Sequence, residues 1–63
     1  MEKLAKALNT TVPKATKALN KAKLDGDELC SLSYAYGMPF EGEGAVNDRL
    51  IDRAFGKVKK AVK

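Results

Sequence analysis

The 63-residue chain contains no histidine and a single cysteine, Cys30. Without histidine, the Ser–His and Cys–His pairs of nucleophilic catalysis are excluded, and Cys30 is the only soft metal ligand available. A lone cysteine also excludes an internal disulfide, and with it the disulfide-stapled scaffolds of small secreted proteins. We therefore expect a protein that is not an enzyme and that has no metal site and no cofactor.

Long hydrophobic runs are also missing. The first six residues carry charges rather than an apolar run, which does not fit a secretory signal. No segment approaches a membrane span, which takes about 18 consecutive apolar residues. From these absences we expect no membrane contact and a cytoplasmic location.

Large apolar residues are few. Hydrophobic residues make up 44% of the chain, but nine of them are alanine. A chain of this length can form one small helical domain over residues 1–63, with a core near the lower limit for independent stability. Because association of two copies would extend that core, a homodimer is an alternative to a monomer.

Charge is distributed in three blocks along the sequence. Residues 1–24 contain six lysines and one glutamate, for a net charge of +5, and residues 25–48 contain six acids and no base, for −6. Residues 49–63 contain six bases and one aspartate, again +5, which gives the overall charge of +4. We expect the acidic block to lie between the two basic ones and to reduce their mutual repulsion.

The strongest helical pattern covers residues 45–63. At about 100° per residue, its apolar residues share one face of a helical wheel and four cations form a separate arc. The apolar face contains Leu50, Ile51, Ala54, Phe55, Val58, Ala61 and Val62. The pattern predicts a long amphipathic C-terminal helix that Asn47 or Gly44 can cap.

Two helices are predicted before residue 25. Residues 1–9 favour a short helix because alanine and leucine dominate them. Thr11 can cap a second helix with Pro13 in its first turn, where the missing N–H removes no helical hydrogen bond. We expect this helix to end near Leu24, with Gly26 in a left-handed conformation.

Residues 27–36 fit two structures. Leu29, Leu32 and Tyr36 have helical spacing, whereas residues 31–36 alternate as a strand does. A lone strand would have no partner here, so we favour a helix that Gly37 ends. Together these segments predict an all-α fold, a compact three- or four-helix bundle.

Cations on two helices form the first candidate site. Several cations on one surface bind nucleic-acid phosphates by releasing condensed counterions. The alternative is a solvated face that keeps the protein soluble. The candidate nucleic-acid-binding residues are Arg49, Arg53, Lys57 and Lys60 on the C-terminal helix and Lys14, Lys17 and Lys21 on the second.

The spacing of Ala22, Gly26 and Leu32 resembles that of helix-turn-helix proteins. The segment that would read bases, residues 27–36, contains no Arg, Lys, Asn or Gln, although such readers depend on those side chains. We therefore assign no family, and we favour the C-terminal helix for any contact with DNA.

The glycine-rich loop over residues 37–44 is the alternative site. Met38, Phe40, Glu41 and Glu43 combine apolar and acidic side chains that a protein partner could contact. We expect Met38 and Phe40 to fold back on the core instead.

Three further acids, Asp25, Asp27 and Glu28, lie at the start of the segment 27–36 or just before it. Their spacing does not match a calcium loop. We expect a polar loop in which Asp25 or Asp27 caps the helix that follows.

The sequence as a whole predicts a small binding protein, either nucleic-acid-associated or transcription-regulatory through a basic helix face. The alternative is a protein-binding adaptor or inhibitor, of viral or mobile-element type, that uses the loop. The choice between DNA and RNA stays open.

Overall fold

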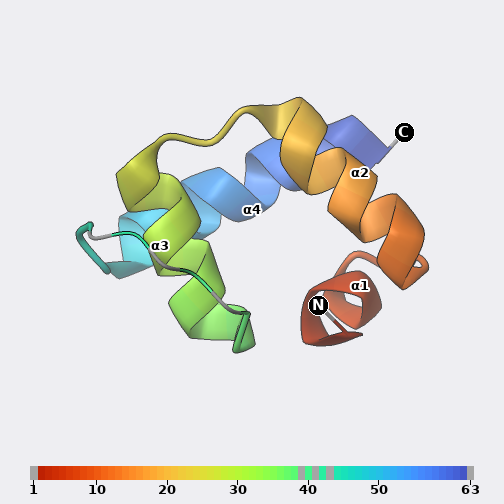
Figure 1. The fold of residues 1–63 in the computed structure, drawn as a ribbon, viewed down its shortest axis with the longest axis horizontal. Coiled ribbons are helices and arrows are strands. Elements are labelled where there is room, and N and C mark those ends of the chain that lie inside the picture. Colours follow the sequence, from red (N-terminus) through yellow and green to blue (C-terminus); the bar gives the residue numbers. More distant parts are fainter. Residues whose placement is uncertain (1, 39, 41, 43, 63) are drawn as a thin grey trace.

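Four α-helices make up the architecture of the computed structural model, which describes residues 2–38, 40, 42 and 44–62 (Figure 1). They are α1 (Glu2–Ala7), α2 (Val12–Ala22), α3 (Gly26–Tyr36) and α4 (Asp48–Val62). The predicted all-α fold with a long C-terminal helix is confirmed. No helix in the described part of the chain is both long enough and apolar enough to cross a membrane.

Helix α4 is the element on which α2 and α3 both pack. Figure 1 shows α3 near its beginning and α2 near its end, and both pack on α4 rather than on each other. Helix α1 packs against α2 and contributes Leu4 to the core. The fold therefore depends on one helix that holds two others at separate places.

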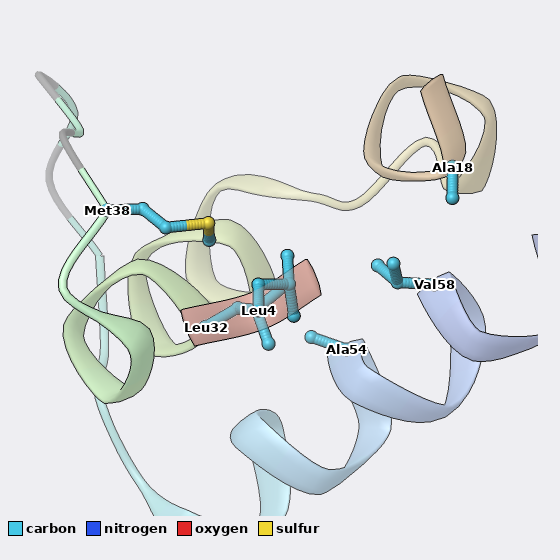
Figure 2. Close-up of a cluster of buried hydrophobic side chains, with 6 residues drawn as sticks. All are labelled: Leu4, Ala18, Leu32, Met38, Ala54 and Val58. Carbon is cyan, nitrogen blue, oxygen red and sulfur yellow. The ribbon is translucent and has the colours of Figure 1, made fainter. Parts of the chain in front are cut away.

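The core is a small cluster with members from all four helices. Figure 2 shows Leu4 beside Leu32 and Ala54 in the centre of this cluster. The six members are Leu4, Ala18, Leu32, Met38, Ala54 and Val58. Since two of them are alanines, α2 and α4 can approach closely, but they bury little apolar area.

Helix α2 begins as predicted. The Thr11 hydroxyl accepts a hydrogen bond from the Lys14 backbone N–H at 3.4 Å, and Pro13 lies in the first turn. Its end differs from the prediction, because Lys23 rather than Gly26 takes the left-handed conformation, with φ of 50°. Gly26 is instead the first residue of α3.

The start of α3 explains this difference. Asp25 accepts a hydrogen bond from the Glu28 backbone N–H at 2.8 Å, and the Glu28 carboxylate accepts one in return from the Asp25 backbone N–H at 3.4 Å. This reciprocal capping box begins a helix directly after Asp25. The helix ends at Gly37, with φ of 63°, so the predictions of a helix here and of its glycine end are confirmed.

Helix α4 begins at Asp48, three residues after the start of the predicted segment 45–63 and directly after Asn47, one of its two predicted caps. Asn47 caps it by accepting a hydrogen bond from the Leu50 backbone N–H at 3.0 Å. The preceding residues are instead held by α3. Ala45 donates its backbone N–H to Asp27 at 2.9 Å and accepts a hydrogen bond from the Ser31 hydroxyl at 2.7 Å.

Gly56 offers a test of the packing around α4. A Cβ added at Gly56 would meet no atom within 4 Å, and glycine in a helix interior costs about 1 kcal/mol relative to alanine. We expect Gly56→Ala to raise the free energy of unfolding by about that amount, measured by urea denaturation. Gly44→Ala is the opposite control, because its Cβ would lie 2.9 Å from an Asp27 oxygen. A lower free energy of unfolding in Gly56→Ala would contradict this prediction, because it would mean that other side chains pack against α4 at Gly56.

Asp25 makes the stability of the fold depend on acidity. The hydrogen bond from the Glu28 backbone N–H, and further the nearby charge of Lys57, hold the pKa of Asp25 below its usual value. Its contribution is therefore complete above the pKa of an unfolded aspartate and is lost as pH falls through the lowered pKa. The Asp25→Asn variant can still cap the helix. We expect its free energy of unfolding, measured by urea denaturation, to lie below that of the wild type at neutral pH, and this difference to become smaller below about pH 4. A gap that stays constant from neutral to acidic pH would contradict this role.

Candidate nucleic-acid interface

Three lysines of α2 line an open groove. Lys14, Lys17 and Lys21 are all exposed, and they recur at intervals of three and four residues on one side of the helix. The groove has a volume of about 490 Å³, and its other lining residues are Ala18, Ala61 and Val62. The structure thus brings the α2 lysines of the predicted site together with the last turn of α4.

The groove results from how α2 and α4 meet. Thr11 and Pro13 fix the start of α2, and burial of Ala15 and Ala18 against the rest of the fold sets its rotation. Because Ala18 and Ala61 have only methyl side chains, they leave space beside the contact between the helices. The lysine stems border that space, and their ammonium groups can reach an anion within it.

The four predicted cations of α4 differ in their surroundings. Arg49, Arg53 and Lys60 are exposed, as predicted, but they do not line the groove. Lys57 instead pairs its ammonium with the Glu28 carboxylate at 2.8 Å. The predicted arc of four cations is therefore interrupted, since one of the four is bound by an acid of α3.

Glu28 lies in the helix predicted over residues 27–36, which is confirmed, but the polar loop expected for the acidic cluster does not extend to it. It lies in the first turn of α3 and is 1% exposed. One carboxylate oxygen accepts hydrogen bonds from Lys57 and from the Asp25 backbone, while the other has no partner among the described residues. The Asp-x-x-Glu spacing of the capping box was visible in the sequence, but the burial of Glu28 and its pairing with Lys57 were not.

The structure does not present the alternative site as predicted for a partner. Met38 is 8% exposed and belongs to the core, which confirms the expectation that it folds back. Phe40 is half-buried, and Glu41 and Glu43 lie outside the described residues. Met38 would have to leave the core before a partner could bind it.

The helix-turn-helix spacing is not realised as a packed motif. Helices α2 and α3 each pack on α4, with little contact between them. Gly26 lies within α3 rather than in the turn. The pair therefore lacks the mutual packing that positions a recognition helix.

No other chemistry gathers in the described part of the chain. Residues 2–38, 40, 42 and 44–62 contain no group of three His, Cys, Asp or Glu side chains placed to hold a metal ion. No protein-family model matches the chain, and neither a curated protein nor a solved structure does. The groove, with its three lysines, is therefore the feature of the described residues from which a function can be inferred.

The Glu28–Lys57 pair generates a stability prediction. We expect Lys57→Met to lower the free energy of unfolding by about 2 kcal/mol, because it leaves a buried carboxylate without its cation. This value is below the usual cost for a fully buried pair, since the Lys57 side chain is 45% exposed. Urea denaturation measures the change.

Two further variants separate this effect from the general loss of a charge. Lys60→Met removes an exposed cation of the same helix and should change stability by less than about 0.5 kcal/mol. Adding Glu28→Gln to Lys57→Met should recover part of the loss, because no charge then remains buried. Equal effects of the two single lysine variants would contradict a structural role for Lys57.

Proposed function

We propose that the chain is a small non-enzymatic binding protein that binds nucleic acid through the groove between α2 and the end of α4. The observation that carries the proposal is the convergence of Lys14, Lys17 and Lys21 on one open groove. A solvated face that only maintains solubility requires no such concavity. A transcription-regulatory role, through binding to DNA, is the finer form of this proposal.

Electrostatics supplies the driving force. Each lysine that neutralises a phosphate releases a condensed counterion, which favours binding most strongly at low salt. The net charge of +4 attracts a polyanion at longer range and raises its association rate. Binding of this kind needs no base-specific contact. Of the side chains that read base edges, the described lining of the groove contains only lysines, which also bind phosphates.

The exposed cations of α4 supply a second contact. Arg49, Arg53 and Lys60 can meet phosphates outside the groove, and the two arginines can do so with two hydrogen bonds each. Lys57 is left out of this proposed surface, because taking it to a phosphate would leave Glu28 buried and unpaired. The proposed interface is therefore the α2 groove, with Arg49, Arg53 and Lys60 as contacts elsewhere on α4.

The test is a titration of fluorescently labelled DNA and RNA at two salt concentrations. A protein that neutralises three phosphates loses about 20-fold in affinity for a single strand and about 40-fold for duplex DNA between about 50 mM and about 200 mM salt, from slopes of about −0.7 and about −0.9 per phosphate. We expect the wild type to lose at least this much. Replacing Lys14, Lys17 and Lys21 together by Gln should weaken binding and make the slope shallower by about one per lysine.

A control triple variant keeps the same overall charge change. Lys3, Lys6 and Lys59 are exposed and do not line the groove, so replacing them by Gln should affect binding much less. Equal losses in the two triple variants would show attraction by net charge alone and would contradict a site in the groove. Absence of binding at the lower salt concentration would refute the proposal.

A further inference from the structure

The shape of the groove restricts which nucleic acid can enter it. Its volume is about 490 Å³, and one of its sides is cationic while the rest is formed by small apolar side chains. A duplex is stiff, with a persistence length of about 150 base pairs, and it presents its phosphates on a convex surface. The lysine tips can touch such a surface, but the apolar residues behind them cannot.

An unpaired strand meets both parts of the groove. Its backbone bends freely, so its phosphates can lie along the lysines while a sugar or base lies on the apolar residues Ala61 and Val62. From this combination we propose that the groove selects single-stranded over double-stranded nucleic acid. The inference rests on the proposed function and names the form of nucleic acid that the site takes.

The spacing of the lysines fits a short strand. Lys14 and Lys21 are seven residues apart, which corresponds to about 10.5 Å along a helix axis. A stacked strand advances about 3.4 Å per nucleotide, so this distance covers about three nucleotides. Three such steps join four phosphates, so the three lysines face a strand of about three to four phosphates.

The groove predicts little preference for base sequence. Aromatic side chains, on which single-strand-binding proteins stack bases, do not occur among its described lining residues. Affinity then comes from the phosphates and from apolar contact with sugars and base faces. Oligonucleotides of different sequence should bind alike, provided that they remain unpaired.

The experiment compares one labelled strand of about 16 nucleotides, chosen to be free of self-pairing, with the duplex of that strand and its complement. With the full chain at about 50 mM salt, we expect the single strand to bind at least about tenfold more tightly than the duplex, because only the strand reaches the apolar residues.

A steric variant probes the floor of the groove without changing its charge. Ala61→Leu fills the space beside the lysines and should weaken single-strand binding about fivefold or more while leaving duplex binding within about twofold. Ala35→Leu is the matched control, because Ala35 is exposed on α3 and does not line the groove. Circular dichroism checks that both variants remain helical. If Ala61→Leu does not fold, Val62→Ala takes its place, and its loss of apolar contact should weaken single-strand binding about twofold.

The outcomes distinguish the preference for single strands from nucleic-acid binding in general. Duplex binding that equals or exceeds single-strand binding overturns this inference and leaves nucleic-acid binding in place. Failure of both probes to bind overturns both. A polyglutamate peptide that binds more tightly than the strand also overturns the inference, because an acidic protein segment would then be the better occupant of the groove.

Discussion

Helices α2 and α3 both depend on one face of α4, where Ala54 and Val58 are completely buried. A chain of 63 residues cannot supply separate cores for each pair of helices. Leu4 from α1 and Met38 from the segment after α3 complete the cluster around these two residues. Any change that rotates α4 therefore disturbs α2 and α3 together, although the two make little contact with each other.

The Glu28–Lys57 pair fixes how α3 is oriented on α4, which apolar contacts alone do not do. Near the start of α3, the buried carboxylate requires its cation, and towards its end Tyr36 stacks on Phe55 with ring centres 5.8 Å apart. These two contacts, one ionic and one aromatic, hold α3 on α4 near both ends of α3. The pair also distinguishes Lys57, whose ammonium is bound by the buried Glu28 carboxylate, from Arg49, Arg53 and Lys60 on the same arc.

Local signals explain most of what the sequence could predict about the fold. Thr11 and Pro13 mark the start of α2, Gly37 marks the end of α3, and the apolar period of α4 identifies its buried face. The error at the start of α4 came from contacts between distant residues. Ala45 is taken out of α4 by hydrogen bonds to α3, 14 and 18 residues away in the sequence.

The same distinction applies to the candidate site. The sequence places Lys14, Lys17 and Lys21 on one face of a helix, since their spacing alone decides that. It does not predict the groove, which exists only because the end of α4 lies beside that face. Nor does it predict that Lys57 pairs with a residue 29 positions earlier.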